Sequence, residues 1–472
     1  MNLKYLLLIY FHISLTISAG AQVKTVYLSD FGAIANDNRS DQQAFNKAAE
    51  YINARKGNTR LIISRGKYLV GVKPRYSRDD DIPTGAASLN NVMNFENCDN
   101  VIIEGTGNVL IRFADGLPFG TLTNRPGSAD SSVHIGSLFR LINCTNITML
   151  NFTADGNNEN FRLLKTWGEG TNSYEREHEG LFILNCQQVI INNVSFLNFG
   201  RDGAMILQDA DKIPVKNIAF TNCSFNNNGR NGLSWCGGED IRLYNCRFNS
   251  NGKGKISTNP AAGLDIEPER YALCKKGSII KCVFSNNGGN SVVSGYAEAS
   301  DVIFDSCTIT GNSNYALLCA SPGFSFKNTA IAGCSLMSYD AANEKDGMNF
   351  INCSFTDSLL KKKVFAPSYL VAITGRYAKF DNCSFTSYKK PALYTDVKKK
   401  KSKEDNENSF FNNCTFNVYF KKPSTWGPYA FLVSHSKFVG CTFRSAGYAN
   451  FKRILNDPEK NVRQQKSIFI NN

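Results

Sequence analysis

A short local pattern recurs along most of the chain and constrains its fold more than any other feature. A small or polar residue, usually Asn, precedes a cysteine, and a Phe often follows two positions later, as in Asn222-Cys223-Ser224-Phe225. From Cys186 onward the steps between these cysteines are 37, 23, 36, 25, 27, 19, 30, 31 and 27 residues. Steps of this size predict one structural unit repeated along an axis. Twelve of the 15 cysteines follow the pattern: Cys98, Cys144, Cys186, Cys223, Cys246, Cys282, Cys307, Cys334, Cys353, Cys383, Cys414 and Cys441.

The repeated cysteines predict an internal column of side chains rather than a set of disulfide bonds. Equivalent residues on neighbouring coils would stack about 4.8 Å apart, the spacing of paired strands. Cysteine fills such a column as a small apolar side chain, and the preceding Asn side chains can bond to one another and to the turn backbone. Disulfides are the usual expectation for an exported protein, but an odd count at equivalent positions suits stacking better.

The units contain strands and turns, with no helical segment long enough to form a βαβ layer. Strands of successive coils must then run parallel, so the sequence predicts an all-β parallel β-helix. One helix is expected near the start, where Ser40-Asp41-Gln42-Gln43 forms a capping box with Ser40 at the N-cap. An amphipathic stripe follows, which would let this helix cover the open end of the coil. The stripe contains Ala44, Phe45, Ala48, Tyr51 and Ile52.

The first residues have the features of a secretory signal. Lys4 precedes an apolar stretch that ends in Ala19-Gly20-Ala21, which predicts a signal peptide over 1–21 cut before Gln22. The stretch is too short for a membrane span. We therefore expect a secreted or periplasmic protein whose residues 22–472 form one β-helix domain. Residues 22–72 would form the N-terminal strand and capping helix, and 92–450 the coils.

The opening of the mature chain resembles a known superfamily. Val26-Tyr27-Leu28-Ser29-Asp30-Phe31-Gly32-Ala33, Asn36-Asp37 and Arg65-Gly66-Lys67-Tyr68-Leu69-Val70 are similar to the start of pectate-lyase-type proteins. The resemblance implies a single-stranded, right-handed parallel β-helix and a secreted bacterial relative of polygalacturonases, rhamnogalacturonases and pectate lyases. The chain lacks the catalytic series of polygalacturonases and the Arg-x-Pro-x-x-Arg pattern of calcium pectate lyases. Their catalytic residues are therefore not carried over.

Four successive coils enter a strand through a glycine, at Gly180, Gly203, Gly232 and Gly263. Period-two alternation predicts that the second and fourth residues after each glycine face outward. Residues just before the glycines would line the same outward ridge. This alignment brings together His178, Glu179, Arg201, Asp202, Arg230 and Asn231, with Asp265 and Glu267 on the last strand and Glu269 and Arg270 after it.

Asp265 and Glu267 are the most distinctive pair in this ridge. They lie two residues apart on one face, so their backbones should be about 6.5–7 Å apart. An isolated Asp-x-Glu is commonly a solvated strand face. Here cationic groups and a histidine lie on adjacent coils, and clustered titratable groups are typical of active sites. We take Asp265, Glu267, His178, Arg201, Asp202 and Arg230 as candidate catalytic residues, and Glu179, Asn231, Glu269 and Arg270 as candidate substrate-binding residues.

Two reactions suit this set of residues. In β-elimination on a uronate, cations or a metal neutralise the carboxylate, and a base such as His178 removes the adjacent proton. In hydrolysis, one carboxyl protonates the leaving oxygen and another activates water or attacks directly, which would use Asp202, Asp265 and Glu267. A third alternative is a non-catalytic, glycan-binding β-helix.

The net charge bears on the choice of partner. The chain has 53 Lys and Arg against 40 Asp and Glu, a formal charge of +13, which favours an acidic polysaccharide and so slightly favours a lyase. The lysine runs lie scattered among C-terminal turns and no nucleic-acid reading motif accompanies them, so nucleic acid is not expected as a partner. No cofactor is required, although Asp265, Glu267 and Glu269 offer the oxygen ligands that Ca²⁺ prefers.

A long excursion over Asp155–Glu177 interrupts the coil just before His178. Long loops without periodicity are usually functional or disordered. Trp167 and Tyr174 are candidate sugar-stacking residues on one wall of a cleft, although Trp also commonly anchors loops by burial. The excursion Lys73–Asn91 would form the opposite wall.

Overall fold

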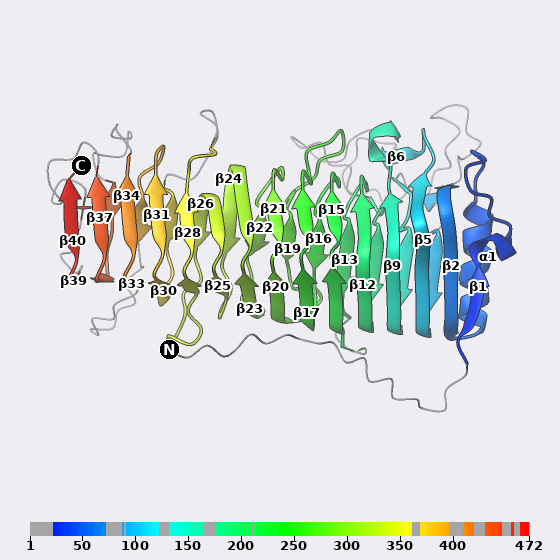
Figure 1. Ribbon diagram of the computed structural model, residues 1–472, viewed down its shortest axis with the longest axis horizontal. Coiled ribbons are helices and arrows are strands. Elements are labelled where there is room, and N and C mark those ends of the chain that lie inside the picture. The colour runs from blue at the N-terminus through cyan, green and yellow to red at the C-terminus, as the bar shows by residue number, and fades with distance from the viewer. Residues whose placement is uncertain are drawn as a thin grey trace.

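The computed structural model describes residues 22–71, 87–88, 91–121, 132–164, 176–209, 212, 214–360, 369–395, 409–419, 430–445, 455–456 and 463–471. These residues form one elongated solenoid whose coils follow each other along its long axis (Figure 1). Each coil places strands on three faces, and neighbouring coils pair in parallel. The predicted all-β parallel β-helix is confirmed.

The first face carries the candidate site. Its strands are β4 (Met93–Glu96), β8 (Phe139–Ile142), β11 (Leu181–Leu184), β13 (Ala204–Leu207), β16 (Leu233–Trp235), β19 (Leu264–Ile266), β22 (Val292–Ser294), the ends of β24 (Thr308–Cys319) and β26 (Ala330–Met337), β29 (Val371–Ile373), β32 (Leu393–Thr395), β35 (Phe431–Leu432) and β38 (Leu455–Asn456).

The second and third faces complete each coil. The second face contains β1 (Lys24–Tyr27), β2 (Gly57–Val70), β5 (Asp99–Phe113), β9 (Thr145–Asp155), β12 (Gln187–Leu197), β14 (Lys216–Thr221), β17 (Gly238–Tyr244), β20 (Cys274–Ile280), β23 (Ala299–Asp305), β25 (Ser325–Lys327), β27 (Asn349–Ile351), β30 (Ala378–Asp381), β33 (Ser409–Asn412), β36 (Ser436–Val439) and β39 (Arg463–Gln465). The long strands β5, β9 and β12 continue onto the third face. The third face also contains β15 (Ser224–Asn226), β18 (Arg247–Asn249), β21 (Val283–Ser285), β28 (Ser354–Thr356), β31 (Ser384–Ser387), β34 (Thr415–Val418), β37 (Thr442–Ser445) and β40 (Ile468–Asn471).

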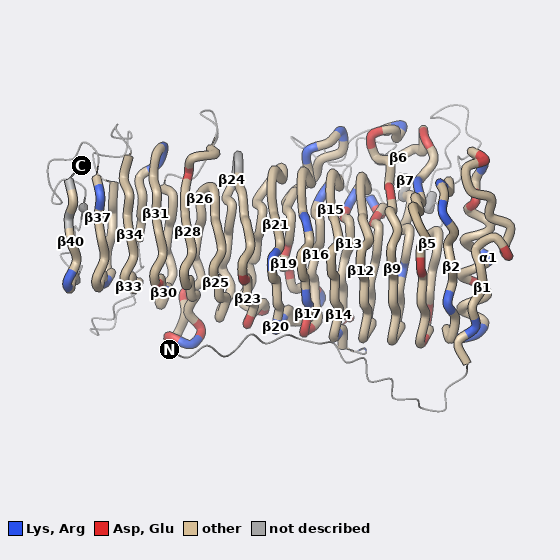
Figure 2. The backbone as a smooth tube through the Cα atoms, viewed as in Figure 1, with Lys and Arg blue, Asp and Glu red and all other residues tan. Residues whose placement is uncertain are grey.

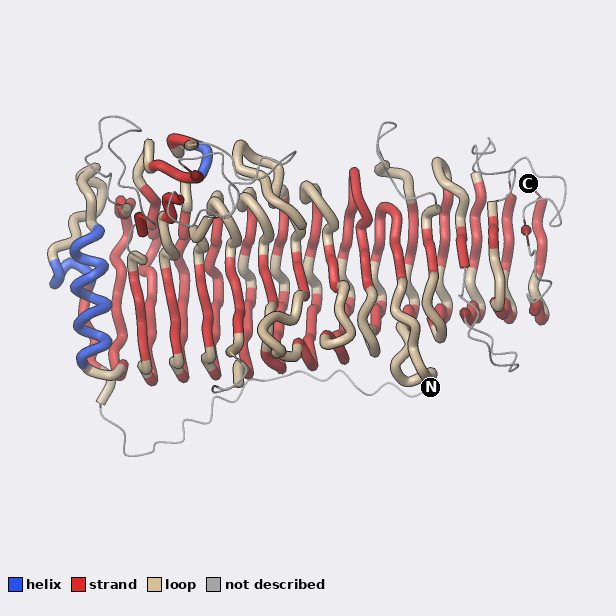
Figure 3. Tube along the Cα trace, turned by 180° about the vertical axis from the view of Figure 1, so that it is seen from behind, coloured by secondary structure: helices blue, strands red, loops and turns tan. Residues whose placement is uncertain are grey.

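Helix α1 (Gln42–Ala54) follows the short 3-10 helix η1 (Leu28–Phe31) and covers one end of the solenoid (Figure 3). Its buried stripe includes Ala44, Phe45, Ala48 and Ile52, as predicted. The predicted N-cap is wrong, because the N-cap residue is Asp41 and not Ser40. The Asp41 carboxylate instead accepts hydrogen bonds from the amides of Ile34 and Leu69, which fastens the helix start to neighbouring chain.

A small additional sheet lies beside the N-terminal coils. It contains β3 (Ala87–Ser88), β6 (Pro118–Thr121), β7 (Ser132–His134) and β10 (Arg162–Leu163), and the 3-10 helix η4 (Asn158–Asn160) precedes β10. Figure 1 shows β6 above the ends of β5 and β9. This sheet brings residues from outside the regular coils close to the start of the candidate ridge.

The cysteines stack on successive coils but form two columns instead of one. All 15 are buried and free, so the prediction against disulfides is confirmed. At the turn between the second and third faces, the amide of Arg247 donates to the Cys223 carbonyl and that of Val283 donates to the Cys246 carbonyl, each at 2.9 Å. Cys98, Cys144 and Cys186 stack separately, at the turn that enters the second face. Cys334 lies in β26, and Thr329 occupies its expected place between Cys307 and Cys353.

The asparagines before the cysteines explain why both turns carry the same motif. Asn185, Asn222 and Asn245 have φ angles of 54° each, in the left-handed region that Asn tolerates better than most residues. The Asn245 side chain donates to Asn222 Oδ1 at 2.7 Å. Each tight turn therefore needs Asn for its backbone and a small apolar residue next, which points inward.

Stacked phenylalanines fill the core between the faces. Phe350 stacks on Phe326 and Phe380 with ring centroids 4.8 and 4.7 Å apart and rings within 5° of parallel. We expect Phe350→Ala to lower the free energy of unfolding by about 3–5 kcal/mol, because it leaves a cavity between two rings. Denaturant unfolding would measure this. The half-buried Phe410 is the control, and an equal loss in Phe410→Ala would contradict the assignment of the column to the core.

Candidate functional site

The glycine alignment of the four coils matches the structure. Leu181 pairs with Ala204, Ala204 with Leu233 and Leu233 with Leu264, which are the residues directly after the four glycines. These residues are fully buried in the main core. The second residues after the glycines therefore form one outward row across neighbouring strands: Phe182, Met205, Ser234 and Asp265.

Part of this outward row is apolar. Met205, Leu207 and Cys236 are buried in a small cluster separate from the main core, with Phe182 and Leu184 packed against it. The guanidinium of Arg140 lies 5.1 Å from the Phe182 ring centroid. The outward face is thus apolar on β11 and β13 and becomes polar at β16 and β19.

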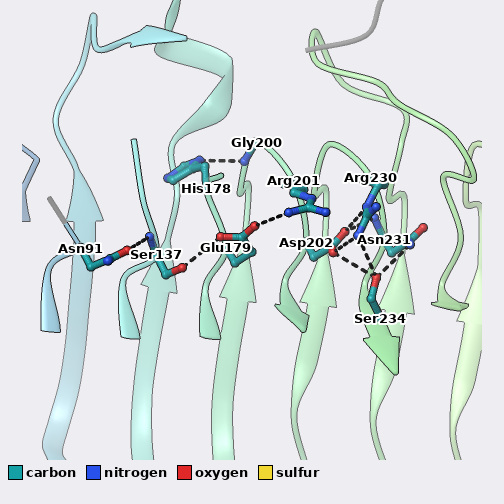
Figure 4. A network of polar contacts seen from close by, with 10 residues as sticks. All are labelled: Asn91, Ser137, His178, Glu179, Gly200, Arg201, Asp202, Arg230, Asn231 and Ser234. Atoms are coloured by element: carbon teal, nitrogen blue, oxygen red, sulfur yellow. Dashed lines mark hydrogen bonds and ion pairs between the residues drawn. The ribbon is translucent and has the colours of Figure 1, made fainter. Parts of the chain in front are cut away.

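Polar side chains just before the strands form two neighbouring sets of contacts, one from Asn91 to Arg201 and one around Asp202 (Figure 4). Asn91 Oδ1 accepts the Ser137 amide at 2.8 Å, and Ser137 Oγ donates to Glu179 at 2.9 Å. Arg201 pairs with the other Glu179 oxygen at 3.2 Å. Burial raises the pKa of Glu179, and the Arg201 charge opposes that rise.

Asp202 and Arg230 form the centre of the second set. Arg230 Nε and Nη2 donate to the two Asp202 oxygens at 2.9 and 2.6 Å, and both side chains are buried. The Asn231 amide and Ser234 Oγ donate to the same carboxylate at 3.0 Å each. Burial would raise the pKa of Asp202, but the Arg230 charge and its hydrogen bonds outweigh it and hold that pKa below its ordinary value. Asp202 is therefore a fixed anion.

Asp265 has the opposite electrostatic environment. Its side chain is 4% exposed, and Asn231 Nδ2 donates to its Oδ2 at 3.0 Å. Burial, followed by the nearby Glu267 charge, raises the pKa of Asp265 to about 8, against the attraction of Arg230. Asn231 also donates to Ser234 and accepts the Ala262 amide, so its orientation is defined. Its surroundings consequently favour the protonated form of Asp265, and the Asn231 side chain holds this carboxyl in place.

Glu267 is the more accessible carboxyl of the pair. It is half-buried, and Tyr296 donates its hydroxyl proton to Glu267 Oε1 at 2.9 Å. This hydrogen bond is the main cause that raises the pKa of Tyr296 to about 12. Glu269 is half-buried, and Arg270 is exposed and paired with Asp209 at 2.5 Å. Asp265, Glu267 and Tyr296 thus meet at the end of β19.

His178 does not lie on the outward ridge, so that prediction is wrong. Its side chain is fully buried, and its ring centroid lies within 4.7–6.1 Å of four phenyl rings. Nδ1 accepts the Gly200 amide at 2.8 Å, and burial lowers the pKa of His178 to about 3. The turn before β11 directs this side chain under the small sheet rather than to the strand face. The surrounding rings belong to Phe113, Phe119, Phe161 and Phe199.

The burial of His178 predicts a pH-dependent stability. The unfolded chain binds a proton on this residue below about pH 6.5, whereas the folded protein does so only near pH 3. Stability from the neutral imidazole is therefore present above this window and is lost as the pH falls. The free energy of unfolding of the wild type should fall between about pH 7 and about pH 5. In His178→Asn, whose Oδ1 can accept the Gly200 amide, we expect this fall to be smaller by about 2 kcal/mol. Unfolding midpoints at both pH values test this, and parallel losses in the two proteins would contradict it.

Some predicted residues cannot be placed. Trp167 and Tyr174, and most of the Lys73–Asn91 excursion, lie outside the described residues. Among the residues described, no group of three or more His, Cys, Asp or Glu side chains could hold a metal ion, so the calcium hypothesis for Asp265, Glu267 and Glu269 gains no support there. No described helix has the length and apolarity needed to cross a membrane.

Sequence reasoning missed Tyr296, Ser137 and Asn91. Ser291 and Leu138 take the place of the marker glycine in the coils after and before the aligned four. The repeat step and the apolar strand Val292–Ser294 were the signals that could have extended the alignment to Tyr296. Without that extension, Tyr296 could not be predicted as the hydrogen-bond partner of Glu267.

Comparisons with known proteins agree with this architecture. Residues 138–336 match the family described as right handed beta helix region. The A-modules of the Azotobacter vinelandii mannuronan C-5 epimerases AlgE4 and AlgE6 each superpose with a TM-score of 0.50, at 12% and 13% identity. The match covers 94% of this chain in both cases, and 97% and 99% of the two modules. The comparison with curated proteins gave no match.

These similarities define a class by fold. The chain has the fold of a right-handed parallel β-helix. At this level of identity, the likeness to the two epimerase modules concerns their fold.

Proposed function

We propose that the protein is a carbohydrate-active enzyme that hydrolyses glycosidic bonds of a polysaccharide lying on the first face near Asp265. The observation that carries the proposal is a carboxyl kept protonated near neutral pH beside a second, more accessible carboxyl, Glu267. Pairs of carboxyl groups in different environments supply the acid and the base of glycoside hydrolysis. The name of the two epimerase modules states that they act on mannuronan, which supports a glycan as the partner.

Each residue has a defined part in this reaction. Asp265 gives its proton to the glycosidic oxygen as the bond to the anomeric carbon breaks. Glu267 activates a water that adds to that carbon, or attacks it directly. Asn231 positions Asp265 through the 3.0 Å hydrogen bond, and the Asp202–Arg230 pair in turn fixes the Asn231 backbone through the Asn231 amide. The anomeric configuration of the first product distinguishes the two roles of Glu267.

The net charge favoured β-elimination, but the contacts of Arg201, Arg230 and His178 favour hydrolysis. A lyase needs cations for the substrate carboxylate and a base for the adjacent proton. Arg201 and Arg230 are already paired with Glu179 and Asp202, and His178 is buried among phenyl rings. The net charge of +13 still favours an acidic substrate, which stays part of the proposal. Export after cleavage before Gln22 also stays part of it.

The test is to incubate the mature protein with neutral and acidic polysaccharides and to analyse the products. Hydrolysis releases reducing ends without the ultraviolet absorbance of an unsaturated uronate, and we expect that result. Its rate should fall as the pH rises through about 8, where Asp265 loses its proton. Unsaturated products would show a lyase, and binding without products would show a glycan-binding protein; either result would overturn the hydrolase.

A further inference from the structure

A cavity lies around the corner from the first face, where the chain passes from β19 to β20. It is open to solvent and has a volume of about 240 Å³. Residues from three coils line it, including Gln208, Val215, Glu239, Tyr271, Leu273 and Lys275. Pockets for drug-sized ligands enclose about 300–1,000 Å³. The size therefore suits one sugar ring better than a longer segment of polymer.

Tyr271 stands at the rim of this cavity and is 99% exposed. Arg270 and Tyr271 have φ angles of 52° and 64°, so two successive side-chain-bearing residues adopt the left-handed conformation. Such backbone costs free energy and persists where the surroundings enforce it, often at binding sites. Two contacts hold the turn: Arg270 pairs with Asp209, and the Ala272 amide donates to the Glu269 carbonyl at 2.9 Å. The turn thus presents an aromatic face to solvent from a fixed backbone.

The charges at the cavity favour an anionic sugar. Glu239 pairs with both Lys216 and Lys276 at 2.9 Å, and its charge is thereby neutralised. Lys275 is the register partner of Glu239 on β20 and lines the cavity. Among the described residues, Lys275 makes no ion pair, so its ammonium group is available to a ligand. Glu239 is the one acidic residue among those that line the cavity, and Lys216 and Lys276 already neutralise it.

We infer that this cavity is an accessory subsite for a carboxylated sugar unit of an acidic polysaccharide, with the ring on Tyr271 and the carboxylate on Lys275. The inference rests on the proposed function, because it specifies the substrate class of the same enzyme. In the view of Figure 2, Lys and Arg (blue) are interspersed with Asp and Glu (red) along the described part of the solenoid.

The experiment measures binding separately from turnover. The full mature chain carrying Asp265→Asn is run through native gels that contain polygalacturonate, alginate or hyaluronan, with dextran as the neutral polymer. We expect retardation by at least one carboxylated polymer and not by dextran. Tyr271→Ala and Lys275→Gln should each weaken that binding by about tenfold, and raising the salt from about 0.1 to about 1 M should weaken it further.

A second tyrosine–lysine pair provides the matched control, with Tyr244 at the end of β17 and Lys281 directly after β20. Tyr244 is 42% exposed, and Lys281 Nζ donates to its hydroxyl at 3.3 Å. Tyr244→Ala and Lys281→Gln should bind as the parent does. The subsite is wrong if no carboxylated polymer is retarded, if dextran is retarded equally, or if the pocket variants and the controls behave alike. If the wild type cleaves none of the polymers while the pocket variants still lose binding, that combination would support the subsite and contradict the proposed hydrolase.

Discussion

Replacing Asp265 by Asn should abolish most of the turnover and at the same time stabilise the fold at neutral and higher pH. General acid catalysis by a positioned side chain contributes about 10²–10⁴-fold to the rate, and an amide cannot donate the proton that the leaving oxygen needs. The amide also cannot ionise, which removes the advantage that the unfolded wild type gains by releasing this proton. The loss should appear in kcat with little change in KM, because the role proposed for Asp265 is confined to the scissile bond.

The pH dependence of stability gives this variant a second signature. The pKa of Asp265 is about 8 in the folded protein and about 4 in an unfolded chain. Between these values only the folded protein keeps the proton, so rising pH costs the wild type stability. Between about pH 5 and about pH 7, the free energy of unfolding of Asp265→Asn should therefore rise by about 3 kcal/mol relative to that of the wild type. A variant that retains wild-type rates, or whose stability follows the wild type at every pH, would contradict the assignment of Asp265 as a buried acid.

Removing Arg230 should be among the most destabilising single substitutions in the site. Arg230→Met leaves the fully buried Asp202 carboxylate without its bidentate partner. Breaking a buried ion pair from one side costs about 3–5 kcal/mol, and denaturant unfolding measures that cost. The exposed pair Arg242–Asp240 is the control, because surface pairs contribute about 0–1 kcal/mol.

A double variant separates the ion pair from simple packing. Asp202→Asn keeps an oxygen for the Asn231 amide but removes the charge that Arg230 neutralises. If the two charges stabilise each other, the double variant Asp202→Asn/Arg230→Met should lose less free energy of unfolding than the two single variants lose together. Additive losses would show that Arg230 acts through packing alone.

The fold could be predicted because its determinants are local and repeated. Each Asn-Cys motif marks a tight turn with a left-handed Asn and an inward small residue, and these turns suffice to define the coils. The motif occurs at two different corners, however, so Cys186 and Cys223 belong to different columns. The number of residues between two motif cysteines does not show whether they occupy the same turn of successive coils or two different turns.

The site could be predicted only where a regular strand defines the direction of a side chain. Asp265 follows Gly263 in a strand, and its outward position is correct. His178 precedes Gly180 in a long turn, where alternation does not apply, and rings from Phe113, Phe119 and Phe161 surround it. The pairing of Arg201 with Glu179 and of Arg230 with Asp202 depends on side-chain conformations across coils, and it changes which cations remain for a substrate.

Co-crystallisation of Asp265→Asn with an oligosaccharide that the wild type cleaves would locate the reaction directly. We predict a scissile oxygen within hydrogen-bonding reach of residue 265, and Glu267 facing the anomeric carbon on the other side. A sugar chain seated on the second or third face, away from these two side chains, would show that the outward carboxyl pair is not the catalytic centre.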